Sequence, residues 1–265
     1  MDTTLYGHLA KPVVALVGTW DPILPDHMAL VHRLIQHAHQ NDRHALLVML
    51  NPSPATFVFQ KAYPDAAWIT YNELETNINC FLTAGADGVL HIHFKPEYLT
   101  MGAAELYDTI CAHAELAELW FGARQTFGRT PEGSQQAIIR LAKERGIRLR
   151  RLAQTNTDKL SAQIRHFLAH GQLAQAVQYA HYPLVRKKPS CGEVSEPWPP
   201  GKYRALPITQ LAEINHIRAD GNQTVECTLH RDGETVSKFR WPNLEIEYLL
   251  FVAGPHDSSA ATALC

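Results

Sequence analysis

The N-terminal two thirds of the chain alternates between short strand-like runs and stretches with helical periodicity, and this alternation constrains the fold most. The strand-like runs read VVALVG, HALLVML, GVLHIHF, ELWFG and RLRRL, and an amphipathic stretch follows each of them. Buried strands separated by helices are typical of a parallel sheet that is covered on both faces. We therefore predict an α/β doubly wound parallel sheet over about residues 10–180.

Glycines mark the ends of several predicted helices. Gly85, Gly146 and Gly171 each stand directly after a helical pattern. Glycine adopts the left-handed backbone conformation that ends many helices at the lowest steric cost. We expect these three residues to terminate helices.

The composition changes in YPLVRKKPSCGEVSEPWPPGKYRALPI, where prolines are frequent and helical periodicity ends. Beyond it, the segment RDGE lies between two alternating stretches, which predicts a β-hairpin. We therefore predict an N-terminal α/β domain over residues 1–185 and a smaller C-terminal antiparallel β domain over residues 186–265. The polar tail of the second domain is expected to fray.

Charge and composition exclude several classes of function. The net charge of −2 and the pI near 6.7 give no general attraction to nucleic acid, and no apolar run is long enough to span a membrane. The five cysteines include no C-x-x-C pair, and the fifteen histidines show no metal-ligand spacing, so we predict no metal site. We expect a cytoplasmic protein with a small-molecule ligand; a protein partner or a homo-oligomer stays open.

The turn after the first predicted strand carries the most specific motif. It reads GTWDPILPDH, and such a turn presents backbone N–H groups and a helix N-terminus to phosphate. It resembles the G-T-F-D-x-x-H-x-G-H turn of the bacterial bifunctional riboflavin kinase/FAD synthetases, in the HxGH nucleotidyltransferase superfamily. Gly18, Thr19, Asp21 and His27 match this motif, and Trp20 replaces an aromatic residue.

Further segments resemble the same family in the same order, which implies its Rossmann-like fold. LNPSP stands where the family has a flavin-site segment, and FGARQTFGRTPEGS resembles a second loop of that site. The resemblance implies that a flavin or related substrate contacts Asn51, Ser53, Phe127, Gly128 and Arg129. It also implies FMN or FAD, or ATP with Mg, as the ligands.

The phosphate-binding motif of this chain departs from the family pattern. The first histidine of the motif is Leu24 here, and its glycine is Asp26. In the family the histidines donate to phosphate oxygens, and loss of one such donor costs about 100- to 1000-fold in rate. Asp26 would add repulsion toward a triphosphate, or it caps the following helix.

The second triphosphate segment of the family, I-S-S-T-R-I-R, corresponds to KLSAQIR here. Ser161 and Arg165 are retained, whereas Ala162 and Gln163 replace a threonine and an arginine. The resemblance therefore implies nucleotide contacts from Gly18, Thr19, Trp20, Ser161 and Arg165, with fewer phosphate donors than in the family.

The kinase part departs further, because the family segment G-R-x-L-G-F-P-T-A-N is absent. Glu226 matches the family's catalytic base but lacks this nucleotide site. We interpret it as a surface strand residue and Trp241 as an aromatic residue of the β-domain core. The second domain is expected to be structural.

These observations support three hypotheses. The first is a diverged FAD-synthetase-like protein that binds a flavin, a nucleotide or a related heterocycle, with adenylyl transfer and riboflavin kinase activity weakened or lost. The second is an active nucleotidyltransferase that uses FMN or a different acceptor. The third is a repurposed enzyme in which His27 forms an acid–base pair with Asp26 or Asp21.

Overall fold

The computed structural model describes most of the N-terminal two thirds of the chain and separate strands beyond it. The described residues are 1–62, 71–123, 125–127, 130–153, 157–180, 184–187, 193–196, 201–208, 225–229, 237–240 and 248–253. The chain divides into two compact units. Unit 1 is Met1–Trp20, Asp26–Val58 and Cys80–Thr155; unit 2 is Asp21–Pro25, Phe59–Asn79 and Asn156–Cys265.

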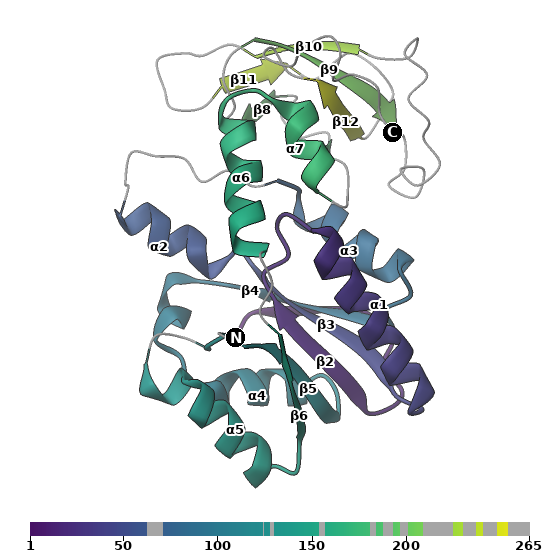
Figure 1. Cartoon of the computed structure of the whole chain (residues 1–265), viewed down its shortest axis with the longest axis vertical. Helices are drawn as coiled ribbons and strands as arrows, with labels where there is room; N and C mark the ends of the chain where they lie inside the picture. Colours follow the sequence, from purple (N-terminus) through teal and green to yellow (C-terminus); the bar gives the residue numbers. More distant parts are fainter. Residues whose placement is uncertain are drawn as a thin grey trace. The chain divides into compact units, whose positions relative to one another are not determined.

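Unit 1 is built on a six-stranded, mostly parallel sheet (Figure 1). Its strands are β1 (Thr3–Gly7), β2 (Val13–Gly18), β3 (His44–Asn51), β4 (Gly88–His93), β5 (Leu116–Gly122) and β6 (Arg148–Leu152). The order is β1-β4-β3-β2-β5-β6, with only β1 antiparallel to its neighbour. The mixed α/β fold with a Rossmann-like sheet is confirmed, whereas β1 was not predicted because its short run lacks a buried pattern.

The helices of unit 1 cover this sheet with apolar faces. Figure 1 shows α4 (Ala103–Cys111) and α5 (Gln135–Glu144) beside each other, and both contribute to a cluster with the strands. Helix α1 (Pro25–Gln40) buries Met28, Val31 and Leu34. Two short 3-10 helices, η1 (Pro96–Thr100) and η2 (Pro131–Gly133), precede α4 and α5.

The predicted glycine termini are confirmed. Gly85, Gly146 and Gly171 have φ angles of +100°, +68° and +68°. Gly85 follows α3 (Leu74–Thr83), and the other two follow α5 and α6 (Thr157–Ala169). A residue with a Cβ atom would be strained at each of these positions.

Unit 2 contains an apolar cluster that joins helices to antiparallel strands. Side chains of α6 and α7 (Leu173–Tyr179) pack in this cluster with β7 (Leu184–Lys187), β9 (Gly201–Ile208) and β12 (Tyr248–Ala253). The described strands pair in the order β10-β9-β12-β7, with β10 at Val225–Leu229. Helix α2 (Pro54–Ala62) lies in the chain between β3 and α3.

The predicted hairpin around RDGE stays a prediction, because residues 230–236 between its two strands lie outside the described residues. The strand before this segment, β10, pairs with β9, and the strand after it, β11 (Ser237–Arg240), pairs with β8 (Glu193–Glu196). Among the described residues, each of these two strands thus pairs with a strand from an earlier part of the chain. The turn itself and Trp241 lie outside the described residues.

Candidate active site

The carboxyl end of β2 lies where the strand order of the sheet reverses. β3 and β4 lie on one side of β2, and β5 and β6 lie on the other. In open α/β sheets, ligands bind in the crevice outside the carboxyl ends of the strands at this point. Gly18 ends β2, and the exposed Thr19 follows it. These two of the five predicted nucleotide contacts therefore lie at the expected edge of the sheet.

Trp20 lies beneath this turn rather than on its surface. Its side chain is buried, and its indole Nε1 donates to the Val48 carbonyl at 3.3 Å. The ring packs edge-on against Phe81, with 5.3 Å between the ring centroids. A Cβ atom on Gly18 would approach the Trp20 ring to 2.7 Å, so glycine is required there by packing. The predicted nucleotide contact of Trp20 stays a prediction.

His27 and Asp26 lie in the first turn of α1. The helix begins at Pro25. The N–H of a first helical residue has no acceptor within the helix, so proline, which has no N–H, suits this position. Asp26 is exposed and His27 is partly exposed, and the His27 ring lies 5.4 Å from the Trp20 ring, centroid to centroid. A helix N-terminus attracts negative charge, so this place suits a phosphate group. The Asp26 carboxylate opposes that attraction.

Asp21 holds a network within unit 2. Its carboxylate oxygens each accept a backbone N–H at 2.9 Å, one from Tyr71 and one from Asn72. Asn72 in turn accepts the Val185 N–H at 2.9 Å through its side-chain oxygen. The Asp21 carboxylate therefore connects the segment 21–25 by hydrogen bonds to the residues that precede α3. The motif alone did not indicate this structural role.

Arg165 joins the same network from α6. Its Nη2 donates to the backbone carbonyl of Asp21 at 2.8 Å. Burial lowers the pKa of Arg165, although the charge of Asp21 works in the opposite direction. A guanidinium with this contact supports the segment 21–25 directly.

Leu24 occupies the place of the first motif histidine. Its side chain has no exposed surface and lies in an apolar cluster with Tyr71, Ile164 and Leu168. An imidazole there would lose water without a polar environment to replace it. Within the described residues, the side chain at position 24 thus serves packing.

The remaining residues of the second triphosphate segment lie on α6. Ser161 is partly exposed, and Ala162 and Gln163 are exposed. The predicted role of Ser161 rests on the resemblance, and it stays a predicted nucleotide contact.

The loop after β5 is held by glutamines that the sequence analysis missed. Gln125 accepts the Gly122 N–H at 2.9 Å and donates to the Val17 carbonyl at 3.3 Å, so it joins the ends of β5 and β2. Gln135 donates to the Ala123 carbonyl from the start of α5. The only sequence signal for this role is that glutamines stand in the loop after β5 and at the start of α5. Glutamine is common on protein surfaces, so this signal does not identify a loop-holding residue.

The flavin-side residues lie at the ends of β3 and of this loop. The Asn51 carbonyl accepts an N–H from the buried His91 at 3.1 Å, and burial lowers the pKa of His91. The Ser53 hydroxyl accepts the Ala55 N–H at 3.3 Å, next to the start of α2. Phe127 is buried and belongs to the core cluster of unit 1. Gly128 and Arg129 lie outside the described residues.

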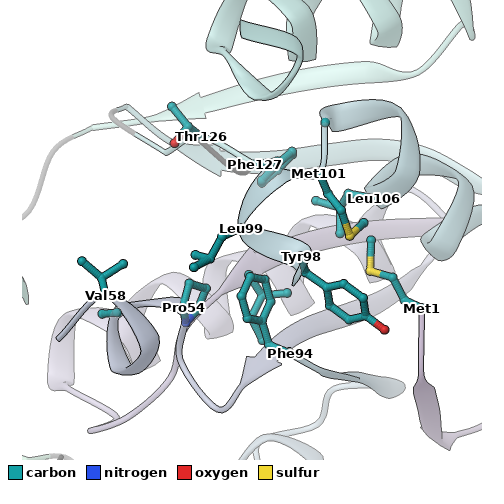
Figure 2. Close-up of a pocket in the computed structure, with 13 residues that line it drawn as sticks. Met1, Pro54, Val58, Phe94, Tyr98, Leu99, Met101, Leu106, Thr126 and Phe127 are labelled. Carbon is teal, nitrogen blue, oxygen red and sulfur yellow. The ribbon is translucent and has the colours of Figure 1, made fainter. Parts of the chain in front are cut away.

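An apolar pocket of about 190 Å³ lies beside these residues (Figure 2). Figure 2 shows side chains that reach it from α2, from η1 and from the loop after β5. Phe94 and Tyr98 pack edge to face, with 5.7 Å between the ring centroids, and Phe127 contributes a third ring. The sequence analysis missed Phe94 and Tyr98 because they lie far in sequence from the recognised loops.

The described part of the chain holds neither a metal-binding cluster nor a membrane-spanning helix. There, His, Cys, Asp and Glu side chains do not gather in groups of three or more that could hold a metal ion. No described helix is both long enough and apolar enough to cross a membrane.

Comparisons with known proteins address the family and the fold separately. No curated protein matches the chain. A solved structure titled as a macrolide-efflux protein from Streptococcus pneumoniae is similar over 95% of this chain and 88% of its own, with a TM-score of 0.61 and 13% sequence identity. At that identity, the likeness concerns the fold alone. The family model for FAD synthetase matches residues 8–163, more than half of the sequence. The chain belongs to the FAD synthetase family.

Proposed function

We propose that this protein binds the ring system of a flavin, or of a related heterocycle, in the pocket beside Phe127. The observation that carries the proposal is the apolar cavity lined by Phe94, Tyr98 and Phe127. Aromatic side chains bind flat heterocycles through offset or edge-on contacts. The pocket also adjoins Leu50 and Pro54, which lie in the segment that resembles the family's flavin site.

The volume of the pocket suits the ring system of the ligand rather than the whole ligand. Sites that enclose a whole small molecule have volumes of about 300–1000 Å³. The cavity of about 190 Å³ is smaller, so a ribityl phosphate or a second nucleotide would extend beyond it. Asn51 and Ser53 lie in the chain between Leu50 and Pro54, which line the cavity, and are proposed to contact the polar edge of the ligand.

We further propose that adenylyl transfer is weakened or lost. The first motif histidine is replaced by Leu24, whose side chain is buried in an apolar cluster. The carboxylate of Asp21 and the guanidinium of Arg165 each hold backbone groups of unit 2. Thr19 and His27 remain as groups that would contact the phosphates of ATP with Mg.

For the C-terminal part, we propose a shortened form of a riboflavin-kinase-like β domain over residues 186–265 with a structural role. The support is the absence of the family's G-R-x-L-G-F-P-T-A-N segment from the sequence. Glu226 lies on β10, opposite Arg204 of β9 in the strand register. We expect Glu226→Gln to leave ligand binding unchanged.

Calorimetric titration with FMN, FAD and ATP, with and without Mg, tests the binding proposal. FMN or FAD is expected to bind with a Kd below the millimolar range. Tyr98→Ala is expected to weaken that binding about 2- to 10-fold through loss of one ring contact, whereas Tyr98→Phe keeps the ring and the affinity. Flavin binding only at millimolar concentration, or equal affinity of wild type and Tyr98→Ala, would contradict the proposal.

A second candidate is an active nucleotidyltransferase, which the position of His27 favours. His27 is partly exposed at the N-terminus of α1, where a donor can reach an α-phosphate. Pyrophosphate release from ATP in the presence of FMN, lost in His27→Ala, would support this function. Release at the rate without enzyme, for every nucleotide tried, would exclude it.

A further inference from the structure

One face of the β5–β6 edge of the sheet carries three charged side chains around a buried tryptophan. In the parallel register, Glu118 of β5 pairs with Arg148 of β6, and Trp120 pairs with Arg150. Residues two apart on a strand share a face, so these four side chains lie on the same side of the sheet. The opposite face, which includes Leu119, belongs to the core cluster with α4 and α5.

Glu118 is a buried carboxylate at the centre of this face. Its side chain is 1% exposed. The Trp120 Nε1 donates to Oε1 at 2.8 Å, and the His37 Nε2 lies 3.1 Å from Oε2. Burial alone would raise the pKa of Glu118, but the hydrogen bonds from His37 and Trp120 and the charge of Arg150 outweigh it and lower the pKa. These contacts already satisfy the carboxylate.

Three arginines surround the same carboxylate. The nearest nitrogen-to-oxygen distances to Glu118 are 3.5 Å for Arg43, 3.7 Å for Arg148 and 3.6 Å for Arg150. Charge-assisted hydrogen bonds measure about 2.7–2.9 Å, so Glu118 engages the donor forks of these guanidinium groups only at longer distance. We call Arg43, Arg148 and Arg150 the arginine cluster.

The charges of the arginine cluster are not balanced by Glu118. One carboxylate neutralises one guanidinium, so a positive excess remains among the described ion pairs of this region. Among the described residues, the buried Arg43 Nη1 has no hydrogen-bond partner beyond its 3.5 Å ion-pair contact with Glu118, which is costly for a charged donor. The side chains of Arg148 and Arg150 are 63% and 44% exposed, so a ligand from solvent can reach them.

Trp120 fixes part of this arrangement. The Arg150 guanidinium lies 4.7 Å from the centroid of the Trp120 ring, within the range of a cation–π contact. The ring itself is buried, and its N–H is held by Glu118. The guanidinium of Arg150 is therefore oriented before any ligand binds, which reduces the entropy lost on binding.

We propose that the arginine cluster binds a multiply charged phosphate anion at a site separate from the proposed nucleotide and flavin sites. Planar guanidinium forks match the oxygens of phosphate, and the excess positive charge favours an anion with more than one charge. Glu118 lies near the amino end of β5, and Arg43 directly precedes β3. The turn after β2 and the pocket lie toward the carboxyl ends of the strands, so two anions can be bound at once.

The proposal can be tested by fluorine NMR of the full chain labelled with fluorotryptophan. The chain has five tryptophans, and the Trp120 signal is assigned from a Trp120→Phe sample. Titration with orthophosphate, pyrophosphate or ATP is expected to shift the Trp120 signal in a saturable way. A shift with ATP alone would assign the effect to the nucleotide and overturn the site as one for a phosphate anion.

Matched variants locate the anion. Arg148→Gln is expected to weaken pyrophosphate binding about tenfold. Arg140→Gln should leave it unchanged, because the exposed Arg140 of α5 pairs with Glu144 outside the cluster. Arg148→Lys, which keeps the charge without the fork, should weaken binding less than Arg148→Gln and guards against a folding defect.

The same titration in His27→Ala separates this site from the turn after β2. We expect the Trp120 shift to be unchanged in that variant. The proposal is wrong if the shift is lost in His27→Ala, if it is equal in Arg148→Gln and wild type, or if no anion shifts the signal at millimolar concentration.

Discussion

Restoring the first motif histidine by Leu24→His is expected to destabilise the protein rather than to restore catalysis. Leu24 is fully buried in an apolar cluster of unit 2. Removal of a buried leucine side chain costs about 2–5 kcal/mol, and a polar group buried without a partner adds about 1–3 kcal/mol. Since imidazole refills part of the volume, we expect a loss of about 3–5 kcal/mol in the free energy of unfolding.

Thermal unfolding followed by circular dichroism measures this loss. A loss of 1 kcal/mol lowers the Tm of a protein of this size by about 2–4 °C, so the shift is well above experimental error. Leu24→Met is the matched control, because it keeps the volume apolar and should cost less than about 1.5 kcal/mol. If Leu24→His unfolds like wild type and gains pyrophosphate release with FMN and ATP, position 24 reaches the phosphates and our reasoning is wrong.

Three further predictions concern the packing and the charges around the site. Gly18→Ala forces a Cβ atom to 2.7 Å from the Trp20 ring and should lower the free energy of unfolding by about 1–3 kcal/mol. In the control Gly122→Ala, the new Cβ atom meets its nearest neighbour at 3.6 Å, and stability should change by less than about 0.5 kcal/mol. Equal Tm values for the two variants would contradict the packing of Trp20. Asp21→Ala removes the carboxylate that accepts hydrogen bonds from two backbone N–H groups. It should lower the free energy of unfolding, measured in urea, by about 1.5–3 kcal/mol. An unchanged urea midpoint would show that these hydrogen bonds make no net contribution to stability. Because the pKa of Glu118 is lowered in the folded state, its contribution to stability is present above the ordinary value of 4.5 and is lost as the pH falls through the folded pKa. The difference in unfolding free energy between wild type and Glu118→Gln should therefore shrink on acidification, and a difference independent of pH would refute this.

Local sequence patterns were sufficient to predict the parallel sheet and the residues at which several helices end. The runs VVALVG and HALLVML are apolar at nearly every position, as strands covered on both faces must be, and they form β2 and β3. Gly146 was predictable because a left-handed residue after a helix favours glycine. The motif around Gly18 likewise identified the family, since its residues are adjacent in the chain.

Local patterns could not predict where the side chains of the motif lie. Leu24 and Asp21 belong to the recognised turn, yet one is buried against α6 and the other holds the backbone at Tyr71. Phe94 and Tyr98 were missed for the same reason, because their pocket forms only when η1 lies beside the ends of distant strands.

The sequence by itself determined the alternation of strands and helices, the glycine termini and the family, because each depends on residues that are neighbours in the chain. Only the tertiary structure decided that Leu24 is a core residue, that three aromatic rings form one pocket and that three arginines surround Glu118. These arrangements depend on strand order and register, which bring side chains together across long sequence separations. Burial and charge are properties of that assembled environment, so no residue type or spacing specifies them in advance.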